Sequence, residues 1–330
     1  MTLRSGLVAA DEVGAMAAVD VEVTIERRAS APVLVPGRSN RHESVVVLGK
    51  SSETNRGLVS AFTGLGYGAW LAEPSIPPRL TSGDIAVARL DVVETLDGVE
   101  PGLWQLPRLA RRGVEVMNGP FALLAAHDKL STALLLGRAG VPQPRTAHVR
   151  EVSLPRFGPP YVVKPRFGSW GRDVYLCRDD AELRARLERL EHRHWFRRQG
   201  ALVQSLVEPT GRDLRLVVAG ERVVGAVERT ALPGEWRTNV ALGAVRRHVS
   251  APPAACELAL RAVTALGIDL AGVDIATDAS GRGYVLEVNG AVDFNATYAD
   301  DVFTAAAVAL LERAVSRSLS RRATSFAWRA

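Results

Sequence analysis

Three oxygen-bearing side chains in the last quarter of the sequence could hold a metal ion together. Asp274 lies in one strand-like segment, 271–277, and Glu287 and Asn289 lie in the next, 283–289. A turn centred between residues 280 and 281 places Asp274 directly opposite Glu287, with Cβ atoms roughly 5 Å apart. Asn289 shares that face of the hairpin, because alternate residues of a strand point the same way.

This pairing constrains the chemistry of the hairpin. Two facing carboxylates repel, so the register requires a cation between them. Carboxylate and amide oxygens suit Mg²⁺ or Mn²⁺ better than zinc. The opposite face is expected to form core, through Val273, Ile275, Leu286 and Val288. A solvated hairpin with another register is the open alternative.

Lysine is rare in this chain. Of 41 basic residues only Lys50, Lys129 and Lys164 are lysine, so 38 are arginine. A lysine among so many arginines is a candidate for a site that needs a compact ammonium; chance is the alternative. Lys164 ends a predicted strand and precedes a flexible loop with Gly168, Ser169, Trp170 and Gly171. Such loops present backbone N–H groups to phosphate, although an ordinary hairpin turn would look similar.

A third polar group lies between two predicted strands. Arg237 and Asn239 fall within the segment 235–239, and Arg229 precedes it. Arginine and asparagine in such a loop could bind phosphate or a carboxylate. They could equally be ordinary loop residues.

The elements that position these residues follow from hydrophobic patterning. Strands alternate with a helix from residue 44 to residue 117, which indicates an α/β layer. A helical section then breaks at Asp128, which can cap a second helix ending before Gly140. The later elements are predicted as strands at 161–164, 174–177, 201–207, 213–219, 222–229, 271–277 and 283–289, and helices at 180–199, 252–266 and 300–317.

Composition excludes several classes of protein. Hydrophobic residues make up 47% and charged residues 23% of the chain, as in globular proteins. The longest uncharged stretch, 57–72, is too short and glycine-rich to span a membrane, and no secretory signal is evident, so we expect a cytoplasmic protein without a membrane partner. The two cysteines form no CxxC motif, and no nucleic-acid-binding signature is present. The net charge of +5, with arginines dense at 185–198 and 245–248, favours an acidic substrate as much as a plain solvated face.

Taken in order, the motifs resemble the ATP-grasp superfamily, and within it the RimK/LysX-type group of carboxylate–amine ligases. The resemblance covers about residues 44–316. It rests on the segments DKLST (128–132), VKP (163–165), FGSWGR (167–172), QSLV (204–207), GRDLR (211–215), EWRTN (235–239), GVD (272–274) and EVN (287–289). Two positions differ from the usual pattern: Ser205 replaces an acidic residue, and residues 241–244 read ALGA in place of ARGG.

The resemblance implies a role for each matching residue. Lys129, Lys164 and the loop 168–171 would contact the ATP phosphates, assisted by Arg237. The hinge 204–207 would hold adenine through the backbone of Leu206 and Val207, beside Gln204, and Asp213 would hydrogen-bond the ribose. Asp274, Glu287 and Asn289 would hold two Mg²⁺ or Mn²⁺ ions. Arg229 and Asn239, with Lys164, would act on the transferred phosphate and the acyl group.

The implied fold is α/β of the ATP-grasp type. It comprises an extension at 1–42, an N-terminal α/β domain at 43–118, a central lid at 119–201, a C-terminal sheet domain at 202–318, and a tail at 319–330. The implied reaction joins an amino acid to a small acid, peptide or acidic carrier protein through an acyl phosphate, forming ADP, in an enzyme that is a dimer or tetramer. An ATP-grasp kinase or carboxylase-like enzyme, a non-catalytic relative and a basic nucleic-acid-binding module are the alternatives.

Overall fold

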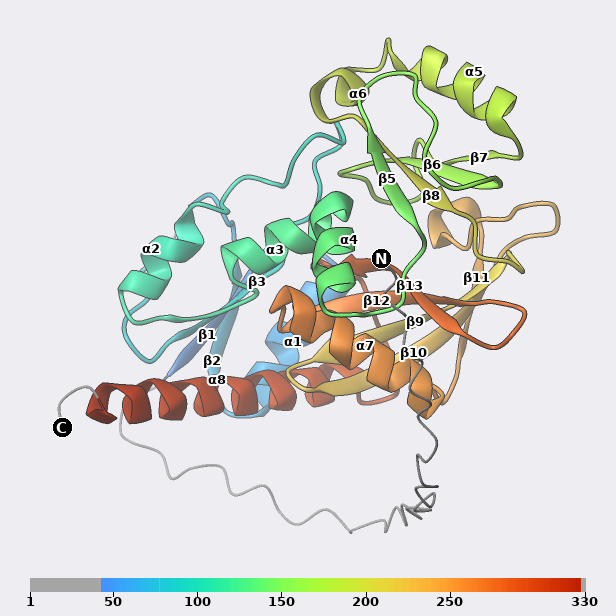
Figure 1. Cartoon of the computed structure of the whole chain (residues 1–330). Coiled ribbons are helices and arrows are strands. Elements are labelled where there is room, and N and C mark those ends of the chain that lie inside the picture. The colour runs from blue at the N-terminus through green and yellow to red at the C-terminus, as the bar shows by residue number, and fades with distance from the viewer. Residues whose placement is uncertain (1–42, 77, 328–330) are drawn as a thin grey trace, which may run out of the picture. The chain divides into compact units, whose positions relative to one another are not determined.

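The computed structural model describes residues 43–76 and 78–327, with side chains to residue 320 (Figure 1). The predicted extension at 1–42 lies outside the described residues. The strands are β1 (Ser44–Leu48), β2 (Gly68–Ala72), β3 (Ile85–Ala88), β4 (Glu115–Met117), β5 (Thr146–Val149), β6 (Tyr161–Pro165), β7 (Tyr175–Cys177), β8 (Ala201–Ser205), β9 (Arg212–Ala219), β10 (Arg222–Thr230), β11 (Val245–His248), β12 (Leu270–Thr277) and β13 (Gly283–Asn289). The α-helices are α1 (Glu53–Gly64), α2 (Gln105–Arg111), α3 (Pro120–His127), α4 (Lys129–Arg138), α5 (Asp180–Leu190), α6 (His194–Gln199), α7 (Pro253–Leu266) and α8 (Val302–Ala327).

The first sheet is parallel, in the order β2-β1-β3-β4. Its central strand β1 is apolar without alternation because both of its faces are covered. Val45 and Val47 pack in one core with residues of α1 and α8, whereas Val46 and Leu48 pack in another with residues of α2. Such continuous apolar strands are typical of parallel sheets. The edge strand β2 was not predicted, since its residues are only partly buried or exposed.

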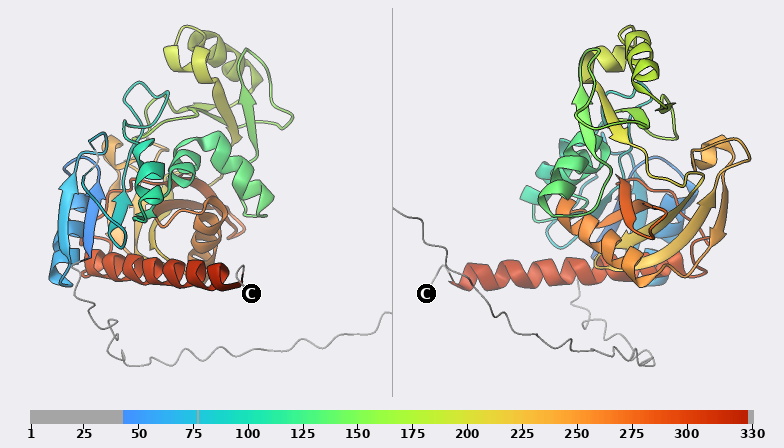
Figure 2. Two further views of the ribbon diagram at one scale, coloured as in Figure 1. Left: turned by 90° about the vertical axis from the view of Figure 1, so that its left-hand side faces the viewer. Right: turned by 45° about the vertical axis from the view of Figure 1, so that its right-hand side comes forward.

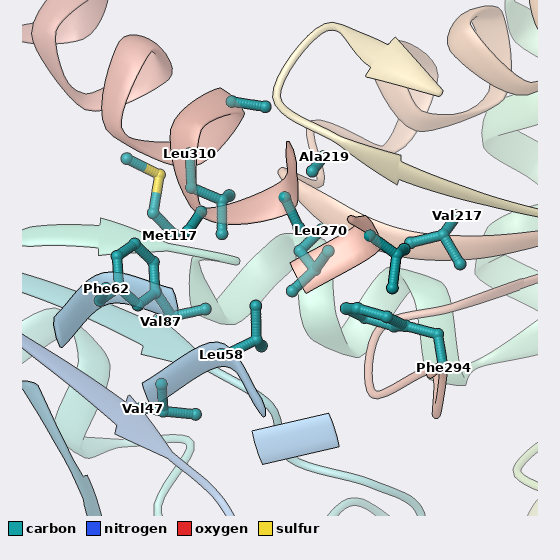
Figure 3. Close-up of a cluster of buried hydrophobic side chains, with 14 of the residues drawn as sticks. Val47, Leu58, Phe62, Val87, Met117, Val217, Ala219, Leu270, Phe294 and Leu310 are labelled. Carbon is teal, nitrogen blue, oxygen red and sulfur yellow. The ribbon is translucent and has the colours of Figure 1, made fainter. Parts of the chain in front are cut away.

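The largest sheet is antiparallel, in the order β11-β10-β9-β12-β13. One face packs on α7. The other face has two parts: its apolar end joins α1, α8 and the first sheet in a single core that includes Val217, Leu270 and Leu310 (Figure 3). Its polar end carries Asp213, Arg215, Arg229 and Asp274. The sheet therefore anchors the predicted site on a well-packed base.

The third sheet, called the small sheet below, has four strands and is also antiparallel, in the order β5-β8-β6-β7. Its core is formed with α5 and α6, which lie on the side of this sheet away from the large sheet (Figure 2). Strand β8 pairs with both β5 and β6, so residues up to Ser205 belong to this sheet. The sequence had placed the boundary between the lid and the C-terminal domain at residue 201. Neither the edge strand β5 of this sheet nor the edge strand β11 of the large sheet was predicted.

Two helix predictions were wrong in extent. The single helix expected at 180–199 breaks after Leu190, and a second helix begins at His194. Helix α5 buries one face, which carries Leu183, Leu187 and Leu190. Trp195 and Phe196 are also buried, but in a continuous helix they would lie off that face. The break lets both aromatic side chains reach the core. The terminal helix runs to Ala327, so residues 319–327 are helical and not a tail.

Each described helix is too short or too polar to cross a membrane.

One buried asparagine connects the first sheet to the large sheet. Asn118 directly follows β4, is fully buried and has a φ of 59°. Its side-chain Nδ2 donates to the carbonyls of Ala88, Leu270 and Gly290, and its Oδ1 accepts from the N–H groups of Asp269 and Leu270. These bonds fix the start of β12 and the residue after β13 against the first sheet.

Candidate functional site

A cavity lies between the small sheet and the polar end of the large sheet. The predicted site residues converge on it from distant parts of the chain. Those that line the cavity are Lys129, Lys164, Gly168, Ser169, Trp170, Gly171, Gln204, Leu206, Val207, Asp213, Arg229, Arg237, Asn239, Asp274 and Glu287. Asn289 is the one predicted site residue that does not line it. The further lining residues include Leu286, Trp236 and Thr238.

The β12–β13 hairpin has the predicted pairing at the site itself. Asp274 pairs with Glu287, and Gly272 pairs with Asn289. Nearer the turn Thr277 pairs with Gly283, so the turn centre is residue 280 and not the 280/281 junction. A β-bulge next to Asp274 absorbs the difference.

The bulge overturns one core assignment. Leu286 was expected to point into the core, but it is the extra residue of the bulge and lines the cavity. Val285 takes the core position instead and is 1% exposed. The carbonyl oxygen of Leu286 lies 3.5 Å from Nζ of Lys164.

Two arginine side chains bind the carboxylate of Asp274. Arg215 donates to both of its carboxylate oxygens, each at 2.6 Å, and Arg229 Nη2 lies 2.9 Å from Oδ2. Burial by itself would raise the pKa of Asp274, but the two guanidinium groups outweigh burial and lower that pKa to about 2. Asp274 is therefore a carboxylate at any ordinary pH.

Glu287 and Asn289 complete the predicted metal ligands. Glu287 Oε1 lies 2.9 Å from Lys129 Nζ, and Asn289 Nδ2 is buried without a hydrogen-bond partner. Within the described residues, no three His, Cys, Asp or Glu side chains could together hold a metal ion. The donor chemistry of Asp274, Glu287 and Asn289 fits Mg²⁺, which binds through one or two carboxylates and takes other ligands from water or phosphates.

The two cavity lysines are held differently. Lys129 opens α4, where Asp128 caps the helix by accepting from the Leu130 N–H, and Lys129 Nζ donates to the Gly168 carbonyl at 2.5 Å. Lys164 ends in the cavity from β6 and is 8% exposed. Burial lowers the pKa of Lys164 to about 8, against the opposing influence of Glu287. A buried, poorly paired ammonium is suited to an anionic ligand.

The glycine-rich loop after β6 packs against the 235–239 segment. Trp170 and Gly171 both have positive φ, and a Cβ added to Gly171 would lie 2.7 Å from Asn239 Oδ1. Arg237 Nη1 donates to the Gly171 carbonyl at 3.2 Å. Arg237 is itself held by Glu235, whose pKa the hydrogen bonds from Arg237 lower to about 2. The loop and the segment thus form one wall of the cavity.

The hinge places Gln204, Leu206 and Val207 on the cavity. The Leu206 N–H donates to the Pro160 carbonyl at 3.0 Å, so only its carbonyl remains for a ligand. The Val207 N–H has no acceptor among the described residues. Ser205, where the resemblance has an acidic residue, accepts from the Arg145 N–H at 3.0 Å.

Asp213 already has protein partners. Arg229 donates to both of its oxygens at 2.8 and 2.5 Å, and the Thr238 hydroxyl donates to Oδ2 at 2.6 Å. A ribose hydroxyl would have to share these oxygens. Arg229, 3% exposed, therefore bridges Asp213 and Asp274.

Sequence reasoning missed Arg215 and Thr238 as site residues. Arg215 follows Asp213 by two positions in β9, and so shares its face, and it pairs in register with Asp274. Strand alternation could have indicated it. Thr238 offered no signal beyond its place in the 235–239 segment. The arginines of 185–198 lie on and beside α5 and α6, and Arg193 and Arg198 are paired with Asp173 and Asp97.

Comparison with known proteins gives one consistent result. The family model described as the RimK-like ATP-grasp domain matches residues 126–312. The chain is 32% identical over 192 residues to the glutamate–LysW ligase ArgX of Sulfurisphaera tokodaii, covering 56% of this chain and 68% of that one. It is 31% identical over 245 residues to the tetrahydromethanopterin:alpha-L-glutamate ligase of Methanosarcina acetivorans, covering 63% and 75%.

Solved structures share the fold. A RimK domain ATP-grasp protein of Sphaerobacter thermophilus superimposes with a TM-score of 0.59 at 22% identity, covering 82% of this chain and 99% of that one. The ATP-grasp ligase PsnB, complexed with a minimal precursor, gives a TM-score of 0.60 at 18% identity, covering 83% and 100%. PsnB has also been solved with Mg and ADP.

Proposed function

The chain belongs to the RimK-like ATP-grasp family and is an ADP-forming carboxylate–amine ligase, and we propose that it adds an acidic amino acid, L-glutamate, to a carboxylate of an acceptor. ATP and Mg²⁺ are the family's cofactors. Two relatives are named as glutamate ligases, one acting on LysW and one on tetrahydromethanopterin. The acceptor of this chain is proposed to be a small acid, a peptide or an acidic carrier protein.

The observation that carries the proposal is the charge of the site. Four cations, Lys129, Lys164, Arg215 and Arg229, surround three carboxylates in and beside the cavity. The carboxylates are Asp213, Asp274 and Glu287. These seven side chains carry a net positive charge. Among the described residues, no carboxylate lies within ion-pair distance of Lys164. The phosphates of a nucleotide would supply the missing negative charge.

We assign the nucleotide contacts from this geometry. Lys129, Lys164 and the 168–171 loop would bind the phosphates, with Arg237 holding that loop in place. Val207 would offer its N–H and Leu206 its carbonyl to adenine, beside Gln204. The ribose would share Asp213 with Arg229.

Asp274, Glu287 and Asn289 are proposed to bind two Mg²⁺ or Mn²⁺ ions. The ions would neutralise charge on the transferring phosphoryl group. Glu287 would then exchange part of its contact with Lys129 for a metal, and the lone pairs of Asp274 not used by Arg215 and Arg229 would serve as ligands.

The reaction has two steps. A substrate carboxylate oxygen attacks the γ-phosphorus of ATP, the bond to the β,γ-bridging oxygen breaks, and ADP leaves. Lys164 and Arg229 offset charge on the transferring group, and Asn239 would donate to the acyl oxygen. The amine of the second substrate then attacks the acyl carbon, phosphate departs with the C–O bond pair, and the ammonium proton passes to solvent. No protein nucleophile is required.

The test is product analysis with ATP, Mg²⁺, L-glutamate and a panel of small acids, acidic peptides and carrier proteins. We expect ADP and phosphate, and a product heavier than the acceptor by one glutamyl residue. Hydroxylamine in place of the amino acid should trap the acyl phosphate as a hydroxamate. AMP among the products would overturn the mechanism, and ADP release without any amine requirement would favour a kinase. Light scattering would test the homo-oligomer that belongs to the same proposal.

A further inference from the structure

An arginine that the site does not yet use lies beside Arg229. Arg246 in β11 pairs in register with Arg229 in β10, which in turn pairs with Asp213 in β9. Residues paired across antiparallel strands share a face, with Cβ atoms about 4.5–5.5 Å apart. The polar end of the large sheet therefore continues past Arg229 to its edge strand, where Arg246 is the next side chain.

Arg246 differs from Arg215 and Arg229 on this face because no carboxylate is bound to it. Arg215 and Arg229 are both bound to carboxylates at 2.9 Å or less. Among the side chains that the structure describes, no carboxylate lies within ion-pair distance of Arg246, although its side chain is half-buried. Its guanidinium carbon instead lies over the Tyr298 ring, 5.9 Å from the ring centroid.

The ring beneath Arg246 is rigidly placed. Tyr298 is 1% exposed, and its carbonyl accepts from the Ala226 N–H at 3.2 Å and from His248 Nδ1 at 2.9 Å. Gly225 allows this close approach, since a Cβ there would lie 2.9 Å from the Tyr298 Cβ. Stacking on a fixed ring lowers the entropy that a guanidinium loses on binding an anion.

We infer that Arg246 is a specificity-determining residue that binds a substrate carboxylate other than the one that is phosphorylated. This inference rests on the proposed ligase function. The phosphates would be held by Lys129 and Lys164, whereas Arg246 lies beyond Arg229 on the edge strand. A planar guanidinium binds a carboxylate through two parallel hydrogen bonds. The carboxylate belongs either to the amino acid that supplies the amine or to the acceptor.

The adjacent arginine provides a matched control. Arg247 occupies the same strand but points to the opposite face, where it pairs with Glu228 at 3.2 Å and its side chain is 75% exposed. Arg246→Gln and Arg247→Gln therefore remove the same charge from the same strand. A general loss of net charge would therefore affect both variants alike.

The experiment measures KM for L-glutamate, for the acceptor and for ATP in both variants. Arg246→Gln should raise KM for one carboxylate substrate by roughly 10- to 100-fold, the range for a charge-assisted hydrogen bond, with KM for ATP unchanged; Arg246→Lys should recover part of the loss. Which KM rises identifies the source of the carboxylate. If KM for glutamate rises, L-glutamine and L-alanine with the wild type separate its two carboxylates. A similar defect with these amino acids assigns the side-chain carboxylate, and no such defect assigns the α-carboxylate.

Equal KM values for both substrates in Arg246→Gln and Arg247→Gln would overturn the assignment, as would a rise confined to ATP. Failure of the ligase function itself would be seen separately, because the wild type would then form no hydroxamate. Thermal unfolding of the two variants separates a fold defect from a binding defect, and an unfolded Arg246→Gln leaves Arg246→Lys to decide.

Discussion

We expect the buried ammonium of Lys164 to lower the free energy of unfolding, although the site needs it to bind phosphate. Its pKa falls from the ordinary 10.5 to about 8 because the ammonium is buried. A difference of this size corresponds to about 3 kcal/mol at about 1.36 kcal/mol per pH unit. At pH 7 the folded state bears this penalty in full, since the lysine is protonated in both states. We therefore expect Lys164→Met to raise the free energy of unfolding of the nucleotide-free, metal-free protein by up to about 3 kcal/mol.

The pH dependence has a definite sign. Between pH 8 and 10.5 the unfolded chain binds more protons at Lys164 than the folded protein does, so the stability of the wild type rises with pH in this window. The advantage of Lys164→Met should accordingly shrink over the same window. At pH 7, ATP with Mg²⁺ should stabilise the wild type but not the variant, because the phosphates lose their buried cation.

The assay is urea unfolding followed by circular dichroism at pH 7, 9 and 10, with and without ATP and Mg²⁺. Lys50→Met is the control, because Lys50 lies 2.5 Å from Glu100 but its side chain is 77% exposed. Exposed ion pairs contribute about 0–1 kcal/mol, so this variant should be equal to the wild type or slightly less stable. A Lys164→Met protein no more stable than the wild type at pH 7 would refute the reasoning.

Three further substitutions test the site. Glu287→Gln should abolish turnover at every Mg²⁺ concentration while circular dichroism stays native, because a metal ligand is lost without a change of shape; near-normal activity at limiting Mg²⁺ would contradict the metal assignment. Lys164→Arg should lower kcat at least 10-fold despite the retained charge, because a guanidinium is larger and planar; unchanged ATP affinity and turnover would mean that the lysine persisted by chance. Gly171→Ala should raise KM for ATP several-fold, since φ is +70° and the new Cβ would lie 2.7 Å from Asn239 Oδ1. Gly168→Ala is its control, with the nearest atom at 3.6 Å, and equal defects in both would remove the packing argument.

Local sequence determined the parts of this protein that depend on neighbours along the chain. The pairing of Asp274 with Glu287 follows from two alternating strands and a short turn between them. The end of α3 and start of α4 follow from the capping side chain of Asp128. The position of Lys164 at a strand end, before a glycine-rich loop, was also readable. In each case the physical cause acts within a few residues.

Only the tertiary structure decided which groups neutralise one another. In a chain with 38 arginines, strand alternation could place Arg215 on the face of Asp213, but it could not show that Arg215 and Arg229 bind Asp274, because these pairs join strands β9, β10 and β12. The outward turn of Leu286 depends on a bulge that lets Val285 and Val288 both reach the core formed with α7. Strands β2, β5 and β11 lie at sheet edges and together have only one fully buried residue, so their apolar signal is weak. Burial and charge pairing between distant segments are properties of the folded chain, and one sequence does not specify them locally.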